Sequence, residues 1–326
     1  MATELKLRRG TTSQHSSFTG AEAEATVDTT KETVVVHDGS TAGGFPLARE
    51  DMSNVDSVAL KTDVGIDLIN SGIDPAVARA VIYNDIGAPV AGGYFAGVID
   101  TISGSIQSND DYQTGERYAL IVAPKELEGG RDSSPAAGLT TGDLRWDALD
   151  RTGESGAFTR WDGLSATNVI IAKNDSNYEV HNFIEEVRNN YEPAPTPGGS
   201  NWYLPAMDEL ELLYRNFKPN YADNRDDTRN RVFPGTQVVG TNPSSDPNGS
   251  QYENGPRNPE KTSIIGFREN EAAAIDLEFY WSTTDADEGG RAWNQLFTPS
   301  GGEGLQTALI KDGDLNSVRP VRRVVL

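Results

Sequence analysis

The pattern of hydrophobic and polar positions changes character along the chain. The first fifty residues alternate over very short stretches: Leu5 and Leu7 stand among basic residues, and 25–28 and 33–37 predict two further strands between glycine turns. About four short strands cannot cover both faces of a sheet. We therefore expect a small β module that buries its apolar side against copies of itself or another domain.

Helical periodicity follows the module. Residues 51–100 predict a connector with short helices, one of them over 75–83 with Asp74 as its N-cap. Two amphipathic helices are predicted further on, at 178–191 and 205–217, because their apolar residues recur at helical spacing. Both apolar stripes are typical of a core-facing helix.

The rest of the chain is a run of short strands and turns. Residues 117–123 and 318–326 form apolar strands near the two ends of this region, and such strands commonly pair. Residues 220–258 form a polar insertion without periodicity, which is typical of disorder or of a binding surface. The predicted class is α+β, mainly β. The expected parts are an N-terminal β module at 1–50, a connector at 51–100 and a head at 101–326.

The composition of the chain excludes several classes of function. The 326 residues include 28 basic and 49 acidic ones, a net charge of −21, which argues against binding nucleic acid or anionic lipid. No apolar stretch approaches the roughly 20 residues that span a bilayer, and MATELKLRRG is followed by polar residues, so neither membrane insertion nor a signal peptide is expected. Cysteine is absent, which excludes disulfides, thiolate metal sites and cysteine nucleophiles.

Catalytic motifs are also missing. His15, His37 and His181 are far apart, and no GxSxG or phosphate-binding glycine loop occurs. Carboxylate pairs such as Asp285 with Asp287 are numerous and keep a two-carboxylate glycosidase open. We expect no catalytic residues, no resident metal and no cofactor, although the sequence leaves calcium binding undecided.

The segment 279–297 combines aromatic and polar residues. Trp293, Gln295 and Phe297 alternate with Asn294 and Leu296, so one face of a strand would present rings and amides. Rings supply contact area and amides supply orientation, which suits both sugar rings and protein epitopes.

Two parts of the chain resemble known protein families. The N-terminal motifs LRRGT, FTG, EATVDTTKETVVVHDG and GGFPLAR stand in the order found in phage tail-fibre proteins of the major tropism determinant type. That resemblance implies a small β module that trimerises and joins the fibre to the virion.

The remainder resembles the C-type lectin-like domain of phage fibres and bacterial adhesins. The motifs that carry this resemblance are ALIVAPKEL at 119–127, TRWDG at 159–163, NWYLPAMDELELLYRNF at 201–217, YWSTTD at 280–285, AWNQLF at 292–297 and VRPVRRV at 318–324. The resemblance implies two helices, a twisted antiparallel sheet and a ligand surface near AWNQLF. The EPN or QPD and WND motifs of calcium-dependent sugar binding are absent, as are the cysteines and iron-binding histidines of the fold's enzymes. This favours binding over catalysis.

The sequence thus predicts a homotrimeric phage tail-fibre or receptor-binding protein, located in the virion and made in the host cytoplasm. Residues 1–50 would contact other tail proteins, and the head would contact a host glycan or outer-membrane protein. The expected receptor contacts are Asp285, Asp287, Arg291, Trp293, Asn294, Gln295, Phe297, Gln306, Lys311, Asp314 and Asn316. Two alternatives remain, a structural tail, baseplate or collar component whose head contacts virion proteins, and a glycan depolymerase.

Overall fold

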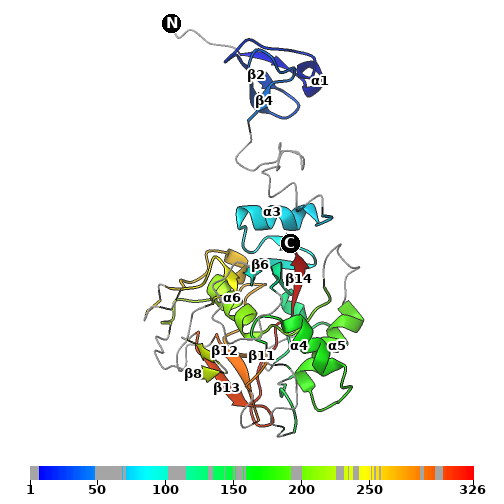
Figure 1. Cartoon of the computed structure of the whole chain (residues 1–326), viewed down its shortest axis with the longest axis vertical. Coiled ribbons are helices and arrows are strands. Elements are labelled where there is room, and N and C mark those ends of the chain that lie inside the picture. The colour runs from blue at the N-terminus through cyan, green and yellow to red at the C-terminus, as the bar shows by residue number, and fades with distance from the viewer. Residues whose placement is uncertain are drawn as a thin grey trace. The chain divides into compact units, whose positions relative to one another are not determined.

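The computed structural model forms two compact units, Met1–Asp67 and Leu68–Leu326 (Figure 1). The structure describes residues 7–47, 68, 71–101, 115–130, 135–142, 144–149, 151, 157, 159–191, 200–224, 231–233, 235–237, 242–250, 252, 255–256, 258–286, 290–297 and 304–326. The sequence also predicts a weakly amphipathic helix in the connector, from Met52 to Ile69, and apart from Leu68 it lies outside the described residues.

The first unit is a four-stranded sheet with one short helix. The strands are β1 (Arg8–Gly10), β2 (Ala25–Asp28), β3 (Thr33–Val36) and β4 (Phe45–Pro46), in the order β1-β2-β3-β4. β1 runs parallel to β2, and the other pairs are antiparallel. Helix α1 (Thr12–His15) begins with a capping box, in which Thr11 and Gln14 each satisfy the other's backbone N–H.

The interior of this unit is mostly polar. Among its described residues, Val35 is the one fully buried hydrophobic side chain. The buried polar side chains are His15, Thr26, Asp28, Thr33 and His37. Four large apolar side chains are exposed instead: Leu7, Val36, Phe45 and Leu47. The unit therefore gains little from apolar burial within one copy of the chain.

The second unit is organised around an antiparallel sheet with the order β10-β6-β7-β14, in which β5 also pairs with β6. The strands are β5 (Pro89–Val90), β6 (Gly93–Asp100), β7 (Arg117–Val122), β10 (Ser245–Asp246) and β14 (Val321–Val325). β14 pairs with β7, with Val321 opposite Val122, which confirms the predicted pairing of the two apolar strands.

Both faces of this sheet are covered, which explains the unbroken apolar run in β7. Tyr118, Leu120 and Val122 face a cluster that includes α6 (Met207–Phe217). Ala119 and Ile121 face the cluster built on α3 (Pro75–Tyr83). Since α3 and β6 belong to the second unit, the head begins at Leu68 in the structure, whereas the sequence placed its start at 101.

Helices complete the head. The two predicted amphipathic helices are confirmed as α5 (Glu179–Tyr191) and α6, with their apolar stripes buried. Helix α4 (Gly163–Ile171), which the sequence did not predict, packs beside α5 in a second cluster with Trp146, Trp202 and Trp281. The 3-10 turns are η1 (Lys125–Leu127) and η2 (Ile265–Phe267).

A second antiparallel sheet, β11-β12-β13, follows near the end of the chain. Its strands are β11 (Phe279–Asp285), β12 (Arg291–Leu296) and β13 (Gln306–Ile310), and a short hairpin joins β8 (Arg231–Phe233) to β9 (Gly235–Gln237). The α+β class is confirmed, and its helices and antiparallel sheets agree with the lectin-like resemblance. Among the helices that the structure describes, none combines the length and apolar character needed to cross a bilayer.

Candidate functional site

Most of the predicted contact residues are buried. The interior ones are Asp285, Trp293, Asn294, Gln295, Phe297, Gln306, Lys311 and Asn316. Arg291 is exposed, Asp314 is half-buried, and Asp287 lies outside the described residues. A buried side chain cannot touch a receptor while the head is folded. The prediction of direct receptor contact therefore does not hold for these eight buried residues.

Lys311 is the centre of that support. Its Nζ donates to Asp285 Oδ2 at 2.6 Å and to the Arg151 carbonyl at 3.2 Å, and it lies 4.6 Å from the centre of the Trp146 ring. Its backbone N–H donates to Gly290, which precedes β12. Because Lys311 and Asp285 are both about 1 % exposed, each charge depends on the other for compensation.

Lys311 thereby joins three segments whose exposed side chains form a candidate contact region. Arg151 also pairs with Asp147 at 2.7 Å, and Asp147 N–H donates to the Lys311 carbonyl. The turn after β13 is closed by Ile310 N–H donating to Asp314 Oδ2 at 2.8 Å. The exposed or half-exposed side chains on these segments are Leu149, Arg291, Ile310, Asp314 and Leu315. Together they are called the Lys311 surface.

The amides of β12 and β13 have an uneven set of partners. Gln295 Nε2 donates to the Gly304 carbonyl, and Gln306 Nε2 donates to the Met207 carbonyl, so these amides tie the sheet to its neighbours. Asn294 is also buried, but neither its Oδ1 nor its Nδ2 has a hydrogen-bond partner among the described residues. Such a group carries a desolvation cost without compensation.

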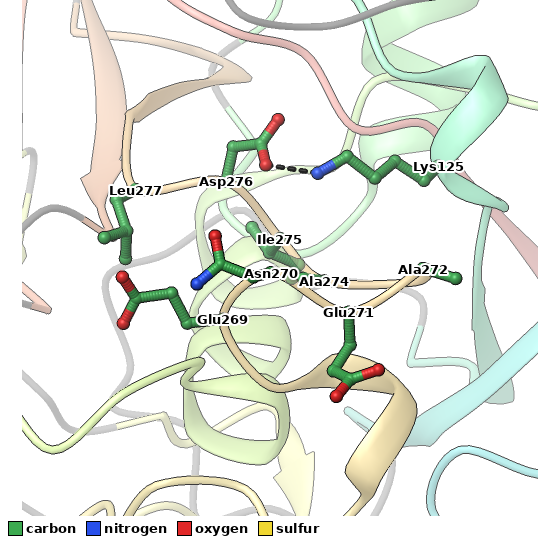
Figure 2. Close-up of a pocket in the computed structure, with 9 residues that line it drawn as sticks. All are labelled: Lys125, Glu269, Asn270, Glu271, Ala272, Ala274, Ile275, Asp276 and Leu277. Atoms are coloured by element: carbon green, nitrogen blue, oxygen red, sulfur yellow. Dashed lines mark hydrogen bonds and ion pairs between the residues drawn. The ribbon is translucent and has the colours of Figure 1, made fainter.

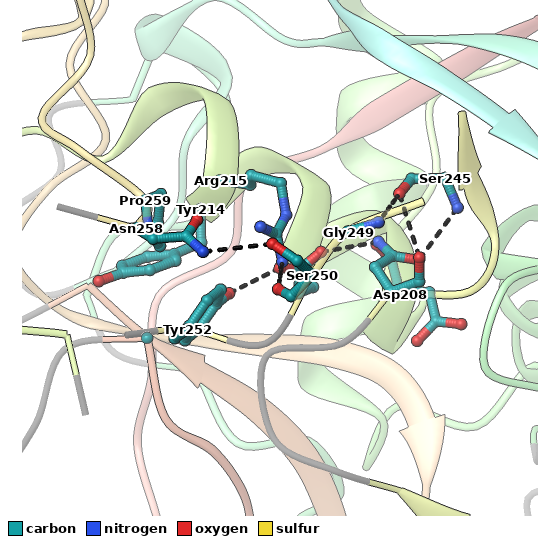
Figure 3. Close-up of polar contacts among 12 residues, drawn as sticks. Asp208, Tyr214, Arg215, Ser245, Gly249, Ser250, Tyr252, Asn258 and Pro259 are labelled. Atoms are coloured by element: carbon teal, nitrogen blue, oxygen red, sulfur yellow. Dashed lines mark hydrogen bonds and ion pairs between the residues drawn. The ribbon is translucent and has the colours of Figure 1, made fainter. Parts of the chain in front are cut away.

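Helix α6 carries a second polar cluster, between the helix and the polar insertion (Figure 3). Arg215 Nη2 donates to Glu211 Oε1 and to the Ser250 carbonyl, and the Tyr252 hydroxyl also donates to Glu211. Ser244 Oγ donates to Asp208 Oδ2 at 2.7 Å. The carboxylates of α6 therefore hold the described residues between 242 and 259 against the helix. The apolar stripe of α6 in the sequence does not indicate this contact.

Asn242 is the best-satisfied amide of this cluster. Its Nδ2 donates to the Asp208 carbonyl and to Glu211 Oε2, while its Oδ1 accepts from the N–H groups of Ser244 and Ser245. The burial of Glu211 raises the pKa of its carboxyl, and the nearby Arg215 guanidinium opposes that rise.

Glu209 lies on the opposite side of α6, inside the apolar core. Its carboxyl accepts from the hydroxyls of Tyr118 and Tyr203, both at 2.6 Å, and from Ala206 N–H at 2.7 Å. Burial raises the pKa of Glu209 to about 7 despite these three donors. The group joins β7 to the start of α6 and is structural.

A cavity of about 440 Å³ lies elsewhere on the head, lined by Lys125 and by Glu269–Leu277 with the exception of Ala273 (Figure 2). Lys125 and Asp276 form an ion pair across its upper side. Beneath it, buried Arg319 pairs with buried Glu128 at 2.5 Å and donates to the Ala273 and Ala274 carbonyls, which fixes the lining segment. Sequence reasoning did not identify this cavity, because no motif marks its residues.

The described side chains include no group of three or more metal-ligating residues. The chemistry available at the Lys311 surface is apolar contact from Leu149, Ile310 and Leu315 and charge pairing from Arg291 and Asp314. These are binding functions, and the arrangement offers no activated nucleophile.

Comparisons with known proteins identify the N-terminal region. The family model described as the major tropism determinant N-terminal domain matches residues 5–41. The tail fiber receptor-binding protein of Bordetella phage BPP-1 is 60 % identical over 63 residues, which are 19 % of this chain and 16 % of that relative. The chain thus spans about a sixth of the length of this curated relative in the match. The predicted resemblance of the N-terminal module is confirmed.

Solved structures of major tropism determinant variants align with this chain over nearly its full length. The M1 variant is 17 % identical with a TM-score of 0.23, and the I1 variant is 17 % identical with a TM-score of 0.22; each alignment covers 99 % of this chain and 100 % of the other. TM-scores this low support no argument about the head.

Proposed function

We propose that this chain is a phage tail-fibre receptor-binding protein, located in the virion, whose N-terminal unit joins other tail proteins and whose head binds a receptor on the host surface. The N-terminal match to a tail-fibre receptor-binding protein carries this proposal. The head supports it with a charged and apolar exposed region on a rigid frame, which is what a binding surface requires.

Within the head, we assign receptor contact to the Lys311 surface. Its exposed apolar side chains would supply buried area, and Arg291 would pair with an acidic group on the receptor. The buried Lys311–Asp285 pair preorganises the surface, so little ordering entropy is lost on binding. The receptor is a glycan or a protein of the outer membrane.

The experiment is competition for adsorption. Purified full-length chain is added to susceptible bacteria before the phage that carries it, and unadsorbed phage is counted. We expect wild-type protein to block adsorption. About tenfold more of the Ile310→Ser variant should be needed for the same block, because it loses one apolar contact with the receptor. Val169→Ser is the matched control, because Val169 is exposed to a similar degree (45 % against 40 %) but lies on α4.

Equal blocking by both variants would remove the Lys311 surface from the contact region. A wild-type chain that binds no susceptible cell, while another virion protein does, would favour the alternative structural role in the tail. Release of reducing sugar ends from the host capsule would instead favour a depolymerase.

We further propose that the chain is a homotrimer assembled through the N-terminal unit. Val36, Phe45 and Leu47, which lie on β3, on β4 and just after β4, are exposed large apolar side chains. Among the described residues of this unit, Val35 is the one buried hydrophobic side chain. Three copies would also multiply weak receptor contacts by avidity. Sedimentation equilibrium of the full chain is expected to give three times the monomer mass, and Phe45→Ser to shift it toward the monomer. A monomeric wild type contradicts the assembly.

A further inference from the structure

A continuous chain of hydrogen bonds crosses the interior of the N-terminal unit. His15 and His37 lie with their rings nearly parallel, 6.2 Å apart, and Thr26 stands between them. Thr26 Oγ1 is 2.8 Å from His15 Nε2 and 2.9 Å from His37 Nε2. The outer ring nitrogens bond to the backbone: His15 Nδ1 to the Thr11 carbonyl at 3.0 Å, and His37 Nδ1 to Gly20 N–H at 3.4 Å.

The two backbone partners determine where the protons lie. A carbonyl can only accept, so His15 Nδ1 carries a proton and its Nε2 is free to accept. An N–H can only donate, so His37 Nδ1 accepts and its Nε2 carries the proton. Thr26 then receives a hydrogen bond from His37 and donates its own hydroxyl proton to His15. Every donor finds one acceptor, and both imidazoles are neutral.

An additional proton has no place in this arrangement. A proton on His37 Nδ1 would face Gly20 N–H, donor against donor. A proton on His15 Nε2 would leave the Thr26 hydroxyl proton without its acceptor. All three side chains are buried, so water cannot supply the missing partner without opening the unit.

The surrounding charges do not remove this conflict. The charged side chains on the elements that pack around the rings are Arg8 and Arg9 of β1, Glu22 and Glu24 before β2, Asp28 of β2, Lys31 and Glu32 before β3, and Asp38 after β3. Asp28 attracts positive charge on His15, but its oxygens already accept from Thr12, Thr30 and Lys31. Arg8 lies 4.9 Å from the Phe18 ring, which contacts His37 edge-on, and its guanidinium also pairs with Glu24 at 3.1 Å.

We propose that the His15–Thr26–His37 chain makes the N-terminal unit acid-sensitive, so that protonation of either ring opens this unit while the head stays folded. An added proton on either ring breaks a hydrogen bond of the folded unit that the open segment does not need, so acidification favours the open form. The unit has one buried hydrophobic side chain among its described residues to resist this opening. The inference concerns the fold of the unit and does not depend on receptor binding.

The first test reads the tautomers directly. Long-range ¹H–¹⁵N correlation spectra of the full chain at pH 7.5 are expected to show His15 protonated at Nδ1 and His37 protonated at Nε2. The signals of the three histidines are assigned by single His15→Gln, His37→Gln and His181→Gln variants. Either ring in the other tautomer, or positively charged at this pH, would overturn the proposal.

The second test measures opening. Amide hydrogen exchange of the full chain, corrected for the intrinsic effect of pH, is compared at pH 7.5 and pH 5. We expect protection in residues 8–46 to fall about tenfold or more at pH 5, the loss of at least one hydrogen bond, with protection in the head undiminished. Equal protection of residues 8–46 at both pH values would overturn the proposal.

Two variants of one residue separate the hydrogen bonds from packing. Thr26→Ser keeps the hydroxyl and is expected to retain the wild-type pH response. Thr26→Val keeps the shape but removes both hydrogen bonds, so residues 8–46 should already exchange faster at pH 7.5 and respond less to acid. A wild-type pH response in Thr26→Val contradicts the role of the His15–Thr26–His37 chain. If this variant does not fold, the exchange of the wild-type protein at pH 7.5 and pH 5 still tests the proposal.

Discussion

In the N-terminal unit the buried side chains are mainly polar and joined by hydrogen bonds, whereas the head combines three large apolar clusters with many buried charged and polar side chains. The first arrangement leaves apolar side chains on the surface and depends on each hydrogen bond. The second spreads its stability over many contacts, so it can hold ionised or unpaired groups such as Glu128 and Asn294 inside. The contrast teaches that the stability of the small N-terminal unit depends on hydrogen bonds between neutral side chains, whereas that of the head depends on apolar packing and on the pairing of buried charges.

The largest expected effect comes from breaking a buried pair in the head. Arg319→Leu leaves Glu128 buried without its cation, and we expect the free energy of unfolding to fall by about 3–5 kcal/mol. Urea unfolding followed by tryptophan fluorescence measures this, because all five tryptophans lie in the head. Arg291→Leu, at an exposed position, is the control, with a change within about 0.5 kcal/mol. A loss of less than about 1 kcal/mol for Arg319→Leu would show that apolar packing alone holds the head.

The pH response of the head should have the opposite sign to that of the N-terminal unit. The pKa of Glu209 is raised from 4.5 to about 7 by burial, so its contribution is complete below about pH 4.5 and is lost as the pH rises through about 7. At about 1.4 kcal/mol per unit, Glu209 alone should remove about 2–3 kcal/mol from the stability of the head between pH 5 and pH 8. Glu128, whose pKa burial also raises to about 7, acts in the same direction, and His181, whose pKa burial lowers to about 3, acts in the opposite one. Urea unfolding at these two values measures the loss.

Glu209→Gln is the matched variant for this prediction, because its amide does not ionise. Its unfolding free energy should therefore depend less on pH than that of the wild type. If the wild-type head is as stable at pH 8 as at pH 5, the two units do not differ in the way proposed here.

A smaller effect distinguishes satisfied from unsatisfied amides within the head. Asn294→Leu removes two buried groups without hydrogen-bond partners and should stabilise the head by about 1 kcal/mol. Asn242→Leu removes an amide with four hydrogen bonds and should destabilise it by about 2 kcal/mol or more. Thermal unfolding of the two variants compares them. Destabilisation by both would mean that Asn294 has a partner when the protein is in solution.

Sequence reasoning succeeded where one periodic signal determined the structure. The apolar stripes of α5 and α6 and the pairing of β7 with β14 follow from spacing alone. The α4 helix was missed because its apolar residues do not form a one-sided stripe: Val169 is exposed, whereas Ala166 and Ile170 pack in the cluster with α5 and the tryptophans. The head boundary was missed because β6 is a strand whose partner, β7, begins seventeen residues after it ends.

The site was harder to predict for a physical reason. Alternating polar and aromatic residues in β12 indicate a strand with two different faces, but they do not say which face meets solvent. Gln295 and Gln306 face other backbone segments, and Lys311 faces Asp285 and Trp146. Arg291 is exposed, as a contact residue must be, whereas the partners Asp147 and Arg151 lie far away in sequence and carry no motif.

The last residue of the sequence lies at the far side of the head from the proposed contact region. Leu326 N–H donates to the Arg117 carbonyl, and its side chain packs against the cluster built on α3, while β13 lies at the opposite end of the head (Figure 1). A fluorophore or a biotin attached at this position would therefore stay clear of the Lys311 surface. A label at this position leaves the Lys311 surface free to face a bacterial cell or a dissolved receptor.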